Sequence, residues 1–193
     1  MKICVFGAAS NEIDSTYIET VEKLGEKMAK RGHSLVFGAG GHGLMGAAAR
    51  GVKKENGHII GVIPSFFREE SIELIFDQCD EMIYTETMAQ RKAKMEDLAD
   101  AFIIVPGGIG TFEEFFEVLT LKQLVRHTKP IAVLDIKNYY KGLEAFLEIS
   151  VAEKFVRGGC KDLYFYSTDC DEILDYIEND KQIKKDVHDL KLG

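Results

Sequence analysis

The sequence predicts a three-layer α/β fold built around a mostly parallel sheet. Short apolar runs alternate along most of the chain with segments whose apolar residues recur at helical spacing. Strands that alternate with helices imply right-handed crossovers and parallel pairing. The runs "AFIIV" at 101–105 and "IAVL" at 131–134 are apolar on both faces, as a sheet covered by helices on both sides requires.

The first half of the chain predicts four strands with helices between them. The strands are the apolar runs at 2–7, 33–38, 58–64 and 81–85. The first helix carries its apolar residues at helical spacing, at Ile18, Val21, Leu24 and Met28, and Gly32 is typical of a helix C-terminal stop. Further helices are expected at 43–56 and 88–99, and the less regular segment 65–80 predicts a loop with one or two helical turns.

The second half continues the alternation. Strands are expected at 101–106, 130–135 and 163–168, and helices at 111–125, 139–155 and 171–179. Asn138 can cap the helix at 139–155. The charged tail 181–193 has Ile183, Val187 and Leu190 at helical spacing, which fits either a terminal amphipathic helix or a frayed end. Together these elements predict one Rossmann-like domain, three-layer αβα, over residues 1–193.

Composition narrows the class of protein. A chain of 193 residues suits a single domain, and a net charge of −8 argues against nucleic-acid binding, which usually needs a basic face. No apolar run is long enough to cross a membrane, so we expect a cytoplasmic protein. The four cysteines show no CxxC spacing and are expected to be buried free thiols.

Three glycine-containing turns follow predicted strands, at 6–10 ("FGAAS"), 38–46 ("GAGGHGLMG") and 106–111 ("PGGIGT"). In open α/β sheets, ligands bind outside the carboxyl ends of the strands. Glycine lets the backbone approach a ligand closely, and a helix start offers unpaired N–H groups that suit phosphate. Tight connections without a ligand are the alternative for any single turn, but three such turns together favour a phosphate or nucleotide pocket.

The turn at 41–46 fits GxGxxG, yet the pattern for a dinucleotide is incomplete. The next strand ends in "GVIPSFF" without the acidic residue that would hold a ribose hydroxyl, which disfavours NAD. The P-loop pattern and a GxSxG elbow are absent, and the five histidines lack metal-ligand spacing.

Two pairs of residues are candidates for ligand binding or catalysis. Arg91 and Lys92 could bind a phosphate, or could form part of a solvated basic helix face. Thr111 and Glu114 fit a capping box, in which side chains satisfy the first backbone donors of a helix. Glu114 could instead be a carboxylate at the pocket mouth that stabilises an oxocarbenium ion or orients water. Spacing alone leaves both readings of Glu114 open.

The stretch "PGGIGTFEE" at 106–114 fits the PGGxGTxxE signature of the LONELY GUY family of phosphoribohydrolases, which release free cytokinin bases from riboside 5′-monophosphates. "VFGAAS", "GAGGHGLMG", "GVIP", "RKAKM" and "EVLTLKQLVRHTKPIAVLD" follow in the family's order, so the resemblance covers roughly residues 2–156. Members are often labelled lysine decarboxylases, but no setting for a PLP-binding lysine can be recognised in this sequence.

The resemblance implies hydrolysis of the N-glycosidic bond of AMP or an N6-prenyl AMP, without a metal or redox cofactor, by a homodimer. Its catalytic residues fall on Arg91 and Glu114. The residues that it places around the substrate are Ser10, Gly40, Gly41, Gly43, Met88, Lys92, Gly107, Gly108, Gly110, Thr111 and Glu113. Thr87 and Ala89 stand where the family commonly has aspartate and histidine. A non-catalytic nucleotide carrier and a ribose 5-phosphate transferase are the rival functions.

Overall fold

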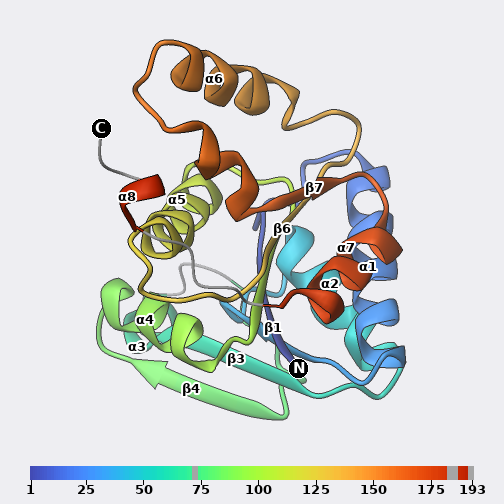
Figure 1. The fold of residues 1–193 in the computed structure, drawn as a ribbon. Helices are drawn as coiled ribbons and strands as arrows, with labels where there is room; N and C mark the ends of the chain where they lie inside the picture. The colour runs from blue at the N-terminus through green and yellow to red at the C-terminus, as the bar shows by residue number, and fades with distance from the viewer. Residues whose placement is uncertain (71–73, 182–186, 191–193) are drawn as a thin grey trace.

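Seven parallel strands form one sheet in the computed structural model, which describes residues 1–70, 74–181 and 187–190 (Figure 1). The strand order is β4-β3-β2-β1-β5-β6-β7. The strands are β1 (Lys2–Phe6), β2 (Ser34–Phe37), β3 (Ile59–Pro64), β4 (Glu81–Thr85), β5 (Ala101–Ile104), β6 (Ile131–Leu134) and β7 (Phe165–Ser167). All of the predicted strands are present and every pairing between them is parallel, which confirms the predicted fold class.

Helices follow the strands much as predicted. They are α1 (Ser15–Lys30), α2 (Gly43–Lys54), α3 (Ser65–Glu69), α4 (Met88–Leu98), α5 (Ile109–Gln123), α6 (Lys141–Ala152), α7 (Cys170–Asn179) and α8 (Val187–Leu190), with a 3₁₀ helix at Gly158–Leu163. In the C-terminal tail, Val187 and Leu190 lie in α8, whereas Ile183 lies outside the described residues. Among those residues, no helix is long and apolar enough to cross a membrane.

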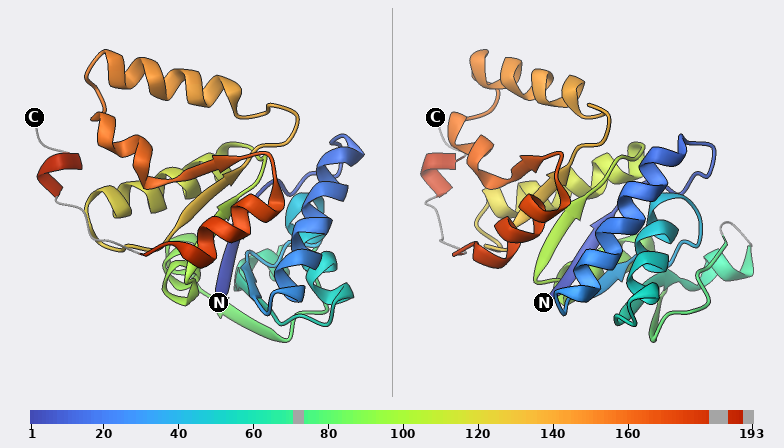
Figure 2. Two further views of the ribbon diagram at one scale, coloured as in Figure 1. Left: turned by 45° about the vertical axis from the view of Figure 1, so that its right-hand side comes forward. Right: turned by 90° about the vertical axis from the view of Figure 1, so that its right-hand side faces the viewer.

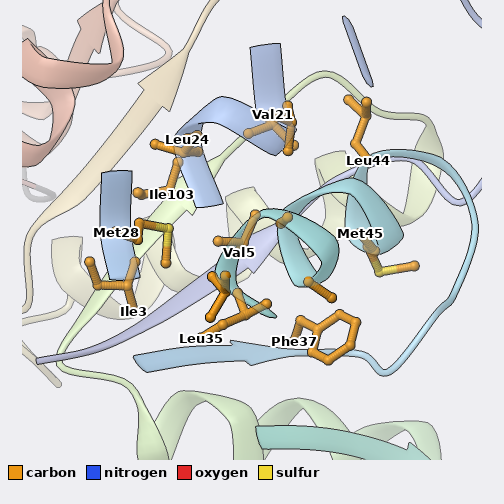
Figure 3. Close-up of a cluster of buried hydrophobic side chains, with 14 of the residues drawn as sticks. Ile3, Val5, Val21, Leu24, Met28, Leu35, Phe37, Leu44, Met45 and Ile103 are labelled. Atoms are coloured by element: carbon orange, nitrogen blue, oxygen red, sulfur yellow. The ribbon is translucent and has the colours of Figure 1, made fainter. Parts of the chain in front are cut away.

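The sheet separates two hydrophobic cores, as the strands that are apolar on both faces require. Helices α1, α2 and α7 cover one face, and α4 and α5 cover the other. Figure 3 shows Val21, Leu24 and Met28 of α1 packed over the strands. All three side chains are fully buried, which confirms the predicted apolar face of this helix. In all views of Figures 1 and 2, α6 lies at the opposite end of the molecule from β4.

Two predicted helix starts are wrong, and both errors concern capping. Helix α5 begins at Ile109 with Gly108 as its N-cap residue, so Thr111 lies inside the first turn and cannot form the capping box. Helix α6 begins at Lys141 after Tyr140, and Asn138 instead adopts a left-handed conformation with φ of 58°. Both helices therefore begin without a side-chain cap, a feature that residue preferences alone do not predict.

The strand order reverses between β1 and β5. From β1 the chain adds β2, β3 and β4 on one side, then returns to place β5 on the other side of β1. Loops diverge at such a point and leave a crevice at the carboxyl ends of the strands. The fold therefore places the turn after β1 and the glycine turn after β5 on the two sides of this crevice.

Candidate active site

Ala8 joins the three glycine turns. Its N–H donates to the Pro106 carbonyl at 3.0 Å, which links the turn after β1 to the turn after β5. Its carbonyl accepts from the N–H groups of Leu44 and Met45, at 2.8 and 3.4 Å, at the start of α2. The three turns, which are far apart in the sequence, therefore meet at one edge of the sheet.

Backbone N–H groups at the start of α2 donate hydrogen bonds to other groups of the protein. The Gly43 N–H donates to the Asn11 side-chain oxygen at 2.7 Å, and the Gly41 N–H donates to the Leu74 carbonyl at 2.7 Å. Gly43 has φ of +56°, and a Cβ there would lie 2.4 Å from the Ala8 carbonyl oxygen, so glycine is required by the fold itself. The N–H groups of both Gly41 and Gly43 in the GxGxxG turn are thus occupied within the protein.

The start of α5 is different. Among the described residues, none accepts a hydrogen bond from the backbone N–H groups of Ile109, Gly110 or Thr111. Gly108 and Gly110 are exposed, and a Cβ added to either would meet no atom within 4 Å. Folding alone therefore does not explain these two glycines. Unbonded N–H groups at a helix start bind anions well, and close approach of a ligand would explain the missing side chains.

A small cavity adjoins this glycine turn. Its volume is about 240 Å³, and its lining includes Ser10, Gly107, Gly108, Tyr17 and Tyr139. The Tyr139 hydroxyl donates to the Gly107 carbonyl at 2.5 Å, and the Tyr140 hydroxyl beside it donates to the Val105 carbonyl. The two tyrosines after β6 therefore fix carbonyl groups of the turn, whereas no described residue accepts from the N–H groups of residues 109–111.

Arg91 lies buried at the carboxyl ends of β2 and β3. Its Nε donates to the Val62 carbonyl and its Nη2 donates to the Gly38 carbonyl, both at 3.1 Å. The guanidinium also lies 5.8 Å from the centre of the Phe67 ring. These contacts hold the charge in place and leave other N–H donors of the guanidinium for a ligand.

Gly38 makes this position of the arginine possible. A Cβ at residue 38 would lie 1.6 Å from Nη2 of Arg91, far closer than two such atoms can approach. The absence of a side chain at Gly38 therefore creates the space that the guanidinium fills.

Glu114 occupies the second turn of α5, partly buried. Burial raises the pKa of its carboxyl group to about 7, and the nearby Arg91 charge acts in the opposite direction. Among the described residues, none donates a hydrogen bond to this carboxyl group. Since α5 begins at Ile109, the helix-capping interpretation of Glu114 is excluded. A carboxyl group that titrates near neutral pH beside a fixed cation is suited to proton transfer or to stabilising positive charge.

Lys92 and Glu113 form an ion pair with each other, and Lys92 also pairs with Glu117. The structure therefore places both predicted substrate-binding side chains in a contact between α4 and α5. Thr87 caps α4 by accepting from the Gln90 N–H at 3.1 Å, which gives the threonine that replaces the family's aspartate a structural role. Ala89 is exposed on the same helix.

One pocket is therefore lined by Ser10, Gly107, Gly108 and Tyr139 just before the start of α5, and Arg91 and Glu114 lie at the same edge of the sheet. Sequence reasoning missed several residues that build it, namely Asn11, Gly38, Phe67, Tyr139 and Glu117. For Gly38 a signal existed, because it opens the quoted turn at 38–46. The others act through contacts between distant segments and leave no local pattern.

The fold defines a doubly wound α/β protein, with a pocket beside the start of α5 and with Arg91 and Glu114 at the same edge of the sheet. A family model described as "Possible lysine decarboxylase" matches residues 45–177. Two Arabidopsis thaliana proteins named cytokinin riboside 5′-monophosphate phosphoribohydrolases are 36% and 35% identical over 177 residues. The alignments cover 92% of this chain and 82% and 81% of those relatives. The chain belongs to the LONELY GUY family of these phosphoribohydrolases, as the motif resemblance predicted.

Solved structures of similar fold include a molybdenum cofactor binding protein from Rippkaea orientalis, with a TM-score of 0.70 and 21% identity over 92% of this chain and 94% of that one. The molybdenum cofactor carrier protein of Chlamydomonas reinhardtii has a TM-score of 0.68 and 22% identity, over 92% of this chain and 95% of that one. These similarities concern the fold alone.

Proposed function

We propose that this protein hydrolyses the N-glycosidic bond of a nucleoside 5′-monophosphate, AMP or an N6-prenyl AMP, to the free base and ribose 5-phosphate. The observation that carries the proposal is the partly buried Glu114 carboxyl, whose pKa is raised to about 7 by burial and which lies within the electrostatic reach of Arg91. The names of the Arabidopsis relatives support the same reaction class.

The start of α5 is the proposed phosphate site. The free N–H groups of residues 109–111 can donate to phosphate oxygens, and Gly107, Gly108 and Gly110 let the phosphate come close to the backbone. Thr111 is buried in the first turn and its side chain packs against Gly107, so it supports the turn from behind.

Other residues would enclose the remainder of the nucleotide. Ser10 lines the cavity beside the turn, and Leu44 of α2 lines it as well; on that side we assign Gly40, Gly41 and Gly43 to the substrate. Met88 is partly exposed at the start of α4, and its sulfur lies 3.9 Å from Nη1 of Arg91. We assign these residues to substrate binding.

In the proposed reaction, water adds to the anomeric carbon while the bond from that carbon to the base nitrogen breaks. The bonding electrons leave with the base, which takes up a proton. Ionised Glu114 stabilises positive charge at the anomeric carbon and accepts the proton of the incoming water. Arg91 stabilises negative charge on the departing base, from a position fixed by two backbone carbonyl groups.

Incubation of the protein with AMP and with an N6-prenyl AMP, followed by chromatography, tests this function. We expect free base and ribose 5-phosphate in equal amounts from the wild type. Glu114→Gln should release no base yet still bind the nucleotide in calorimetry. Intact nucleotide after incubation with wild-type protein would support the carrier function instead, and exchange of labelled base into the nucleotide would support a transferase.

We further propose a homodimer formed through the surface around α6. Phe146 and Ile149 of α6 are 62% and 59% exposed, Phe155 after the helix is 85% exposed, and Phe116 of α5 is 36% exposed. Clustered apolar side chains of this size usually mark an interface. Light scattering after size exclusion should give a dimer, and Phe146→Glu should shift it toward the monomer. A wild-type monomer would refute this assembly.

We also propose that the protein is cytoplasmic. Cys4, Cys79, Cys160 and Cys170 are all free, and persistent free thiols are typical of a reducing compartment.

A further inference from the structure

Lys92 joins the two helices that carry the proposed catalytic residues. It follows Arg91 on α4, and its side chain is 17% exposed. Its Nζ lies 2.7 Å from Oε2 of Glu117 and forms a second, short contact with Glu113, both on α5. A lysine that binds phosphate would instead direct its ammonium group toward the pocket. Here two carboxylates of the neighbouring helix already surround the ammonium group.

The two carboxylates also flank the proposed catalytic carboxylate, Glu114. Glu113 and Glu117 are four residues apart, so they lie on one face of α5, and Glu114 directly follows Glu113. Like charges at this spacing repel each other and disfavour the helix. Lys92 offsets that repulsion, because one ammonium group contacts both side chains. The contact also ties α5 to α4 beside Arg91.

The charges around Glu114 come from several elements. Glu113 and Glu117 of α5 raise the pKa of Glu114, whereas Arg91 and Lys92 of α4 lower it. From the sheet, the buried thiol of Cys4 faces the same region, and burial raises its pKa so that it stays neutral.

Further along α4, burial raises the pKa of Glu96 to about 7, and the charge of Glu117 adds to that effect. Lys129 packs onto this part of α4, with its ammonium group donating to the Glu96 carbonyl. Removal of Lys92 would therefore leave an excess of negative charge around Glu114 and favour its protonated form.

We propose that Lys92 is a positioning residue for the glycosidic hydrolysis, which aligns α4 with α5 and favours the ionised form of Glu114 by offsetting part of the negative charge of Glu113 and Glu117. This inference rests on the proposed function. Lys92 then affects the reaction by way of Glu114, and the paired carboxylates of α5 belong to the same ion-pair arrangement.

Steady-state kinetics of Lys92→Met across pH 5 to 9, with AMP as substrate, test the proposal. We expect the acidic limb of kcat/KM to move upward by roughly one pH unit, which corresponds to an activity loss of about tenfold on that limb. At pH 9 the activity should largely return, and KM should change less than about threefold, because phosphate binding is not affected. Lys92→Arg should restore the wild-type profile.

A charge-matched variant keeps the test decisive if Lys92→Met folds poorly. Lys92→Met combined with Glu117→Gln removes one positive and one negative charge, so the net charge beside Glu114 equals that of the wild type and the acidic limb should return toward its wild-type position. A tenfold rise in KM for Lys92→Met with an unshifted pH profile would overturn the proposal and make Lys92 a phosphate ligand. A loss of kcat that is equal at every pH would also overturn it. Wild-type protein that releases no base would instead refute the proposed function itself.

Discussion

Gly110→Ala separates the demands of folding from the demands of ligand binding at the start of α5. Gly110 is the second residue of α5, and a Cβ there meets no atom within 4 Å. The substitution should therefore leave the fold intact and stabilise it by about 0.4–1 kcal/mol, because alanine loses less backbone entropy on folding. The new methyl group would, however, stand where the proposed phosphate approaches the backbone.

The loss in binding can be worked out from the hydrogen bonds at stake. A hydrogen bond to a charged group contributes about 1.5–3 kcal/mol, so losing one of those from the N–H groups of residues 109–111 corresponds to roughly 10- to 150-fold weaker binding. Titration calorimetry with AMP measures this change, and urea denaturation measures the stability.

Gly142→Ala is the matched control for this experiment. Gly142 is the second residue of α6 and also has open space around its Cβ position, but it lies outside the pocket. It should give the same gain in stability with unchanged affinity for AMP. Wild-type affinity in Gly110→Ala would refute the assignment of the phosphate site to the start of α5.

Three further changes test the site. Gly38→Ala should lower kcat by about 100-fold or more, because its Cβ would displace Arg91 and remove a fixed charge; activity close to wild type would contradict the placement of Arg91. For Glu114, the folded-state pKa of about 7 exceeds the ordinary 4.5, so stability is lost as pH rises from about 4.5 to 7. The free energy of unfolding of Glu114→Gln, relative to that of the wild type, should therefore be higher by up to about 3 kcal/mol at pH 8 than at pH 4.5. Urea denaturation measures this difference, and an equal difference at both pH values would refute the shifted pKa. The kcat/KM of the wild type should rise with pH through about 7, since the ionised form is active, and a flat profile would exclude Glu114 as the titrating group. Thr87→Ala should cost about 1 kcal/mol of stability through the lost cap of α4, and an unchanged melting temperature would show that the cap contributes nothing.

Strands and buried helix faces could be predicted because each follows from a local periodicity. The run at 101–105 is apolar at every position, and α1 repeats its apolar residues at 18, 21, 24 and 28, so strand and helix can be recognised without knowing what packs on them. The first residues of helices were harder to predict from the sequence. Thr111 and Asn138 are both good capping residues, yet backbone geometry places each of them elsewhere.

The candidate site could likewise be predicted from the sequence only in part. Glycine turns at strand ends predicted where a ligand would bind, and the family motif assigned Arg91 and Glu114. The sequence could not show which turn has free N–H groups, because that depends on partners such as Asn11 and Leu74, which occupy the donors of the GxGxxG turn.

The sequence by itself determined the α/β class, the family and the edge of the sheet at which the candidate site is proposed, because these follow from short-range patterns. Tertiary structure decided the rest. It placed Glu114 inside α5 and not at its cap, buried the carboxyl enough to bring its pKa to about 7, and paired Lys92 with two carboxylates of the neighbouring helix. Burial and charge depend on which segments meet in space, and no local pattern records those encounters.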